Sequence, residues 1–298
     1  MKRLHILLIL VAAGTVVNAQ QIMTFSLYDM HGNLHNPATV GASQHTTIGA
    51  SYRTMWDGID GGPQTTVLFG SGYFKNAKVG LGGYFYNDVT GPTRRTGVQA
   101  AVSYHIPLDK GGTFSLGLEG RFQQYAIDKA KLQASIGNDP VLGAEENRFK
   151  GDAGFGVSYN GKKFKAGASV SNLIQSKLDF YSGNLTRSEE GRQYRHYYFH
   201  SNYTINADGT TKLIPHILFV YLPEVPLEVQ GGVRVEHNDV FWWGVALRAR
   251  QSWMLSAGVK LHKKFTIGYC FDIFQTPLSV YDRGSNGHEV LLKYDFLR

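Results

Sequence analysis

The chain has a single cysteine, Cys270, among its 298 residues. An internal disulfide therefore cannot form, and a thiolate zinc site is unsupported because no second cysteine lies nearby. Beyond the first residues there is also no apolar run of the roughly 20 residues that a membrane-spanning helix needs. An α-helical membrane protein is thereby excluded, and we interpret Cys270 as a packing or barrel-lining residue.

The sequence also lacks the short motifs that carry common chemistry. It contains no phosphate-binding loop, no His-Glu-x-x-His zinc helix and no Gly-x-Ser-x-Gly nucleophile elbow. The net charge is +7, but the basic residues are scattered rather than clustered, which gives nucleic-acid binding no support. We expect a protein that is not an enzyme and has no cofactor and no metal.

The first residues have the layout of an export signal. Lys2 and Arg3 precede an apolar run from Ile6 to Val17, and Ala19 offers a small residue for cleavage. We predict a signal peptide at residues 1–19. The alternative, a retained anchor, is disfavoured because the run is too short to cross a bilayer as a helix.

Alternating apolar and polar residues recur after the signal. From Phe114 to Phe122 the apolar residues and the charged residues Glu119 and Arg121 fall on opposite faces, and 227–235 repeats the pattern with Glu228 and Arg234. Such segments of about ten residues are typical of membrane-spanning strands with one face toward lipid and the other toward the lumen. The 35 glycines, 17 tyrosines and 17 phenylalanines fit this class.

Comparable segments predict fourteen strands, an even number that returns both termini to the same side of the membrane. They are placed near residues 44, 64, 78, 96, 113, 152, 163, 194, 212, 226, 239, 251, 264 and 287. Long connections are expected at 54–63, 87–94, 126–151, 174–192 and 275–286. The predicted fold is all-β, a transmembrane antiparallel β-barrel at 44–298; the alternative is a soluble β-sandwich or barrel.

A polar segment at residues 20–43 precedes the first strand. It contains Asn36, Pro37 and Ala38. We expect it to lie in the periplasm or to reach into the lumen.

Several ordered motifs carry a resemblance to a known family. Asn-Pro-Ala at 36–38 is followed by Tyr-Arg-x-x-Trp at 52–56 with a Gly-Gly-Pro turn, and then by Gly-Leu-Gly at 80–82 and Tyr-Asn-Asp at 86–88. Later runs include Arg-His-Tyr-Tyr at 195–198 and Gly-His-Glu at 287–289. In these motifs the chain resembles the PorP/SprF family of the type IX secretion system, over nearly its whole predicted mature length. Cys270 is a departure, since serine is commoner there.

The resemblance implies an outer-membrane protein of Bacteroidota. It also implies that the protein supports export or surface attachment of large adhesins, including those of gliding motility. The implied partners are outer-membrane lipid, secreted adhesin cargo and components of the secretion system, including a periplasmic partner anchored to peptidoglycan. A FadL-like outer-membrane channel for small or apolar solutes is the alternative, and an outer-membrane hydrolase would need a nucleophile and base that the sequence does not supply.

Candidate plug or partner contacts come from these motifs and their loops. They are Asn36, Pro37, Arg53, Trp56, Asp60, Asn87 and Asp88. Loop packing is the competing interpretation for Arg53 and Trp56. His288 and Glu289 resemble half of a catalytic pair, but adjacent residues of a strand point to opposite faces, so we predict no catalysis there.

Overall fold

The computed structural model describes residues 23–109, 111–131, 146–177, 192–223, 225–275, 278–281 and 286–297. The predicted signal peptide lies outside these ranges. None of the helices in this part of the chain is long and apolar enough to span a membrane. They include the short α2 (Tyr28–His31), the 3-10 helix η1 (Pro37–Thr39) and α4 (Leu278–Tyr281).

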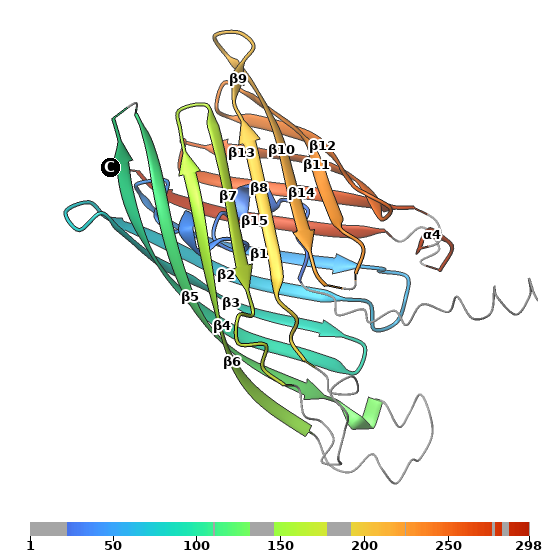
Figure 1. Ribbon diagram of the computed structural model, residues 1–298. Coiled ribbons are helices and arrows are strands. Elements are labelled where there is room, and N and C mark those ends of the chain that lie inside the picture. The colour runs from blue at the N-terminus through green and yellow to red at the C-terminus, as the bar shows by residue number, and fades with distance from the viewer. Residues whose placement is uncertain are drawn as a thin grey trace, which may run out of the picture.

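Fourteen antiparallel strands close into one barrel, in which β1 pairs with β15 and β10 pairs with β11 (Figure 1). The strands are β1 (Thr46–Met55), β2 (Gln64–Phe74), β3 (Val79–Thr90), β4 (Thr93–Leu108), β5 (Gly112–Ile127), β6 (Glu146–Asn160), β7 (Phe164–Ser171), β8 (His196–Tyr203), β10 (Thr211–Tyr221), β11 (Glu228–His237), β12 (Phe241–Arg248), β13 (Ser252–Leu261), β14 (Phe265–Phe274) and β15 (Gly287–Phe296). The short β9 (Ile205–Asn206) pairs only with β10. The predicted fold class is confirmed.

The prediction of a long loop was wrong at 87–94, and the loop predicted at 126–151 was too long. Residues 87–94 are not a loop, because β3 and β4 stay paired as far as Thr90 and Thr93 and are joined by Gly91 and Pro92. Similarly, β5 and β6 remain paired between Phe122–Gly151 and Ile127–Glu146, inside the predicted loop 126–151. These strand ends are polar, so the apolar alternation that marks the membrane-spanning part fades before the pairing ends.

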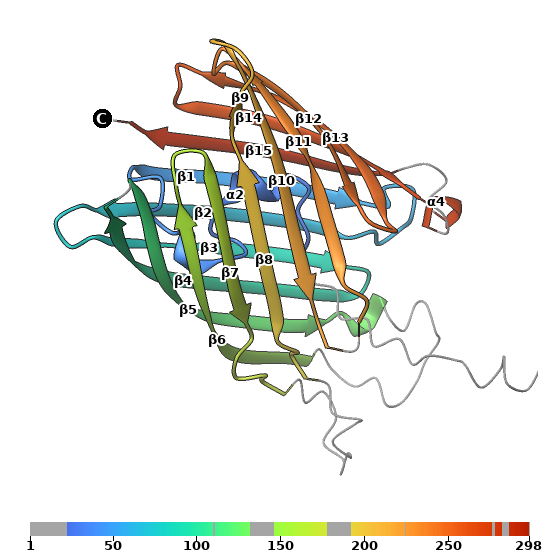
Figure 2. The same ribbon diagram turned by 45° about the horizontal axis from the view of Figure 1, so that its top comes forward.

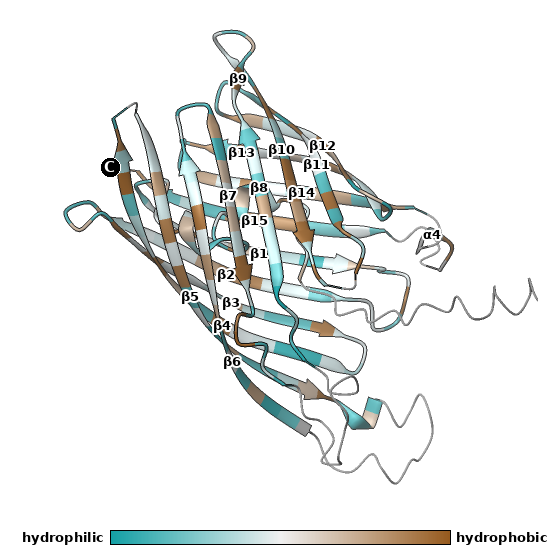
Figure 3. Cartoon of the chain, in the orientation of Figure 1, coloured by the Kyte–Doolittle hydropathy of each residue, from teal (hydrophilic) through white to brown (hydrophobic). Residues whose placement is uncertain are grey.

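The predicted faces of the strands are as the alternation requires. Leu118 and Phe122 are exposed on the outer face, whereas Ser115 and Glu119 are buried toward the lumen. Hydropathy accordingly changes from residue to residue along the strands (Figure 3). A closed barrel leaves no strand edge unpaired, and its apolar outer face suits a lipid environment.

Residues 23–45, which we call the plug, fold inside the barrel (Figure 2). Three plug residues, Phe25, Leu27 and Leu34, pack in the lumen with apolar residues of the wall. These wall residues are Val67, Phe69, Tyr84, Tyr86, Trp242, Ala246, Met254, Cys270 and Leu291. Cys270 is therefore a lumen-lining packing residue, as expected. We call the end at which β1 finishes the long-loop end, and the opposite end, with the β2–β3 and β13–β14 turns, the short-turn end.

Candidate functional site

Buried charged residues hold the plug in the half of the lumen nearer the long-loop end. We call them the ion-pair cluster: Arg53 of β1, Arg248 of β12, Asp272 of β14 and Glu289 of β15. Arg53 Nη2 lies 2.5 Å from Asp272 Oδ2, and Arg53 Nη1 lies 3.1 Å from Glu289 Oε2. All four side chains are almost fully buried. Unpaired charges would be very costly here, so each depends on its partners.

Ser26 inserts the plug into this cluster. Its hydroxyl accepts a hydrogen bond from Arg53 and donates one to Asp272 Oδ1 at 2.7 Å. Its backbone amide donates to Glu289 Oε2 at 2.6 Å. One small plug residue thus contacts groups of three wall strands, and charge-assisted hydrogen bonds of this kind are the stronger ones in proteins.

The backbone of the plug is held beside the same cluster. Gln230 of β11 donates to the carbonyl oxygens of Phe25 at 3.2 Å and Ser26 at 3.3 Å. Arg248 donates to Gln230 Oε1 at 3.2 Å through Nε, which fixes the amide so that its nitrogen faces the plug. These bonds satisfy backbone groups that would otherwise be buried without partners.

The short helix α2 makes two contacts with the other side of the wall. Tyr28 Oη lies 2.8 Å from His216 Nδ1 on β10. Burial raises the pKa of Tyr28, so its phenol keeps its proton beside the imidazole. Asp29 forms an ion pair with Arg234 of β11, which also pairs with Glu236 at 3.0 Å.

Asn36 starts η1 and ties it to the wall. Its Oδ1 accepts from the amide of Ala38 at 2.9 Å, and Pro37 occupies the first helical position, where its missing N–H is not needed. The Asn36 amide nitrogen donates to the carbonyl of Val157 at 3.0 Å. The Asn-Pro-Ala motif is therefore both a helix start and a wall contact.

Two paired glycines make room for this motif. Gly117 of β5 lies directly opposite Gly156 of β6. A Cβ atom on Gly117 would overlap the backbone nitrogen of Ala38, and one on Gly156 would overlap Asn36 Oδ1. The wall is thus shaped for close approach of the plug backbone.

The last turn of the plug is fixed by His105 of β4. The carbonyl of Val40 accepts from Ser103 Oγ at 2.6 Å and from His105 Nε2 at 2.9 Å. Because a carbonyl only accepts, the proton of a neutral His105 sits on Nε2, and Nδ1 accepts from Ser115 Oγ at 2.7 Å.

Gln193, in the described part of the β7–β8 connection, also lies in the lumen near the long-loop end. Gln193 is 2 % exposed. Its amide donates to Tyr125 Oη at 2.7 Å and its carbonyl oxygen accepts from Gln123 at 3.3 Å. The plug and Gln193 thus both lie in the lumen between the strands.

The structure brings three of the predicted site residues together around the plug. Asn36 and Pro37 lie in the plug itself, and Arg53 is in the ion-pair cluster. Trp56 lies at the long-loop end, where its ring packs at 6.5 Å from that of Phe274 and its amide donates to the carbonyl of Asn286.

The other three do not reach the plug. Asp60 is exposed in the β1–β2 loop. Asn87 accepts from Thr96 at 2.9 Å, and Asp88 pairs with Arg95 at 3.1 Å, so both make cross-strand contacts near the long-loop end.

Sequence reasoning missed the other members of the ion-pair cluster around Arg53. Asp272, Glu289 and Arg248 are polar residues at inward positions of predicted strands, and this signal was readable. Their convergence was not, because it depends on the register of β1, β14 and β15 across more than 200 residues of sequence.

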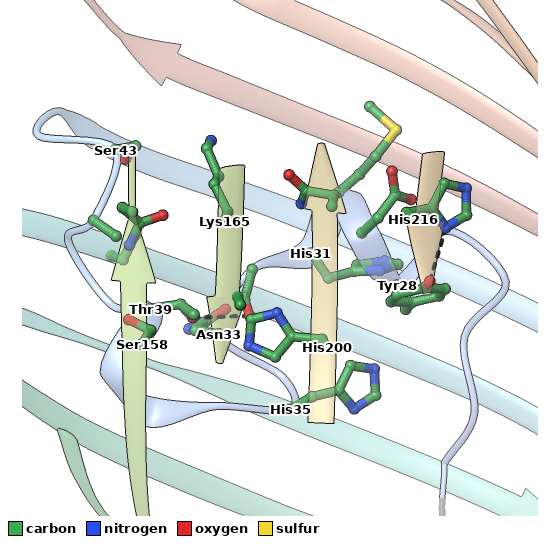
Figure 4. Close-up of a pocket in the computed structure, with 18 of the residues that line it drawn as sticks. Tyr28, His31, Asn33, His35, Thr39, Ser43, Ser158, Lys165, His200 and His216 are labelled. Carbon is green, nitrogen blue, oxygen red and sulfur yellow. Dashed lines mark hydrogen bonds between the residues drawn. The ribbon is translucent and has the colours of Figure 1, made fainter. Parts of the chain in front are cut away.

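A cavity of about 200 Å³ lies between the plug and the wall toward the short-turn end. Figure 4 shows its lining, which includes Tyr28, His31 and His35 from the plug and Lys165, His200 and His216 from the wall. Among the described residues no group of three or more His, Cys, Asp or Glu could hold a metal ion.

The closed barrel has the same fold as outer-membrane proteins of known structure. Omp33 of Acinetobacter baumannii matches with a TM-score of 0.50 at 9 % identity, covering 85 % of this chain and 98 % of that one. The toluene transporter TodX of P. putida matches at 0.51 and 8 % (90 % and 94 % covered), and a FadL homologue of Pseudomonas aeruginosa at 0.51 and 11 % (89 % and 94 %). At these identities the likeness shows the fold alone: this is an outer-membrane β-barrel.

The family is shown by sequence. The model of the type IX secretion system membrane protein PorP/SprF matches residues 17–294, and the chain belongs to that family. It is thus an outer-membrane component of type IX secretion, a role that implies contact with other components of that system. A search of curated proteins found no match.

Proposed function

We propose that this barrel supports the export or surface attachment of large cell-surface proteins, of the gliding-adhesin type, in a Bacteroidota cell. It acts as a platform in the outer membrane, binding secreted cargo and a periplasmic partner anchored to peptidoglycan. We propose further that it has no catalytic activity. Glu289 lies in the ion-pair cluster, while His288 bonds to Tyr269 on the opposite face, so the two do not form a pair.

The occupied lumen is the observation that favours a platform over a conduit. Ser26 is tied to buried charges, and the Asn36–Ala38 motif is seated against paired glycines. Opening a path through the lumen would require breaking a buried ion-pair network, and buried charges are costly to leave without their partners. A platform needs no such opening, because cargo and partners can bind at its two ends.

The experiment is surface proteomics of a clean deletion strain and of the strain complemented with the intact gene, scoring proteins with type IX sorting domains. We expect loss of one or a few such proteins, restored by complementation. An unchanged surface together with altered uptake of small or apolar solutes would instead favour the FadL-like channel. The similarity in fold does not by itself assign that function.

A further inference from the structure

A groove at the short-turn end has a lining that the plug contacts do not explain. It measures about 860 Å³, on the scale of ligand pockets, which are roughly 300–1,000 Å³. It lies between the β13–β14 turn, which contributes Lys264, and the β2–β3 turn, which contributes Lys75 and Asn76. Residues of β15 and β1, the two strands between these hairpins in the wall, complete it. Because short turns of outer-membrane barrels face the periplasm, the groove lies at the periplasmic boundary of the membrane.

Aromatic side chains line the part of the groove that faces the membrane. Phe74 of β2 and Phe296 of β15 are 55 % and 48 % exposed. Each lies an even number of residues from an exposed leucine of the outer face, Leu68 in β2 and Leu292 in β15, so both point outward. The ring of Tyr294, also at an outward position, has its centroid 4.7 Å from that of Phe296. This side of the groove therefore fits an occupant with hydrocarbon chains.

Two lysines flank the groove. Lys75 directly follows the last residue of β2, and Lys264 directly precedes the first residue of β14. Neither ammonium group has a hydrogen bond or an ion pair in the part of the chain that the structure describes. None of the described residues that line the groove is acidic. The two positive charges are therefore available to an anion.

The carboxylate beside the groove does not neutralise these lysines. Asp295 alternates with the outward Tyr294 and Phe296 and points into the lumen, where its side chain is 5 % exposed. It pairs there with His45 at 3.2 Å and with Lys293 at 3.6 Å. The charge of Asp295 is thus taken up inside the barrel, and the groove stays positive.

We propose that this groove binds an anionic phospholipid of the periplasmic leaflet. Lys75 and Lys264 flank its phosphate, and its acyl chains lie against the aromatic side chains of β2 and β15. Lysine binds phosphate as a point charge, and basic pockets of helical membrane proteins hold anionic headgroups in this way. A lipid fits because the aromatic side of the groove continues the outer face of the barrel, which already lies in the membrane. The site goes beyond the export role and does not depend on it.

The test uses the full barrel purified in detergent. The probes are phosphatidylglycerol and the zwitterionic phosphatidylcholine with the same acyl chains. Native mass spectrometry at increasing lipid concentration gives the fraction of the barrel that carries one lipid. We expect phosphatidylglycerol to bind at the lower concentration, because both lipids offer hydrocarbon but only phosphatidylglycerol has a net negative charge.

Two matched double variants make the test specific. Lys75→Gln with Lys264→Gln should lower the affinity for phosphatidylglycerol about 25-fold, or about fivefold for each lysine, and leave the affinity for phosphatidylcholine unchanged. Lys162→Gln with Lys163→Gln removes the same charge from the exposed β6–β7 turn, at the same end of the barrel but outside the groove lining. This control should bind both lipids as the original chain does.

The proposal is overturned if the unaltered barrel binds the two lipids equally, or if the two double variants lose the same affinity for phosphatidylglycerol. Acetylated, amidated hexaglutamate is the remaining probe. If it displaces the bound phosphatidylglycerol at equal concentration, the groove is a site for an acidic polypeptide, which also overturns the proposal.

Discussion

Arg53 Nη2 and Asp272 Oδ2 lie 2.5 Å apart in the lumen, each on a side chain that is 1 % exposed. The two residues are on strands β1 and β14, which are not neighbours, since β15 lies between them. Ser26 bridges them from the plug. The pair therefore links the plug to the part of the wall where the first and last strands meet.

Replacing Arg53 should be strongly destabilising. Arg53→Gln leaves Glu289 in a buried site without its cation and Asp272 with only Arg248, whose Nη1 lies 3.9 Å away, and breaking such a buried pair typically costs about 3–5 kcal/mol. The measurement is the urea midpoint of the barrel in detergent micelles. Arg94→Gln, at an exposed position of β4, is the control and should leave the midpoint unchanged.

A second replacement separates charge from packing. The double variant Arg53→Met, Asp272→Leu removes both members of the pair. It should recover a large part of the stability that Arg53→Gln loses, because a buried ion pair can often be replaced by apolar residues. If Arg53→Gln had the stability of the original chain, the ion-pair cluster would not be what fixes the plug.

The paired glycines Gly117 and Gly156, which make room for the plug, lead to a different prediction. Gly117→Ala places a Cβ against the backbone of Ala38, so the plug must shift, at a cost of about 1–3 kcal/mol. Hydrogen exchange of residues 33–45 should become faster while exchange of the wall strands stays slow. Gly120→Ala, in the same strand with open space around it, should leave exchange unaltered. Equal exchange in both variants would contradict the close approach of plug and wall.

The wall was largely predictable and the plug was not. Every predicted strand position lies in, or within two residues of, an observed strand, because a membrane wall imposes strict alternation. Glu289 and His288 were correctly assigned to opposite faces on this basis. The plug, by contrast, is irregular and has no periodicity, so its path depends on tertiary contacts that no local pattern encodes.

The candidate residues show the same division. Arg53 was identified as a candidate for the lumen from its motif, but its carboxylate partners were not. Asn87 and Asp88 were placed in a predicted loop, whereas they lie in strand β3, which extends past the apolar zone. Polar strand ends are the part of a barrel that sequence patterns identify least well.

Acid should loosen the plug. The pKa of His31 is lowered by burial to about 3, so His31 stays unprotonated in the docked plug. In a released plug its pKa would be near the ordinary value of about 6.5, and His31 would bind a proton below that pH. Protons therefore favour release: stability of the docked state is full above about pH 6.5 and falls below it, by up to about 1.4 kcal/mol per pH unit for one histidine.

Hydrogen exchange of the plug at about pH 7 and about pH 5, corrected for intrinsic rates, measures this effect. His31→Asn should reduce the dependence on pH, whereas His262→Asn, at an exposed turn, should keep it. Plug exchange that is equal at both pH values would contradict the assignment of a neutral buried His31.

The β1–β2 loop is the candidate contact with secreted cargo. It is ordered by backbone bonds, among them Gly91 N to the Gly61 carbonyl at 2.8 Å, and it exposes Asp60 at the long-loop end, which faces outward in outer-membrane barrels. If cargo contacts this loop through a basic group, Asp60→Lys should lower surface display about fivefold, as expected for a rim contact worth about 1 kcal/mol. Quantitative surface proteomics of the complemented deletion strain measures the loss. Asp109→Lys makes the same charge reversal at the short-turn end and should not change display; a normal surface in the Asp60→Lys strain would exclude Asp60 as a cargo contact.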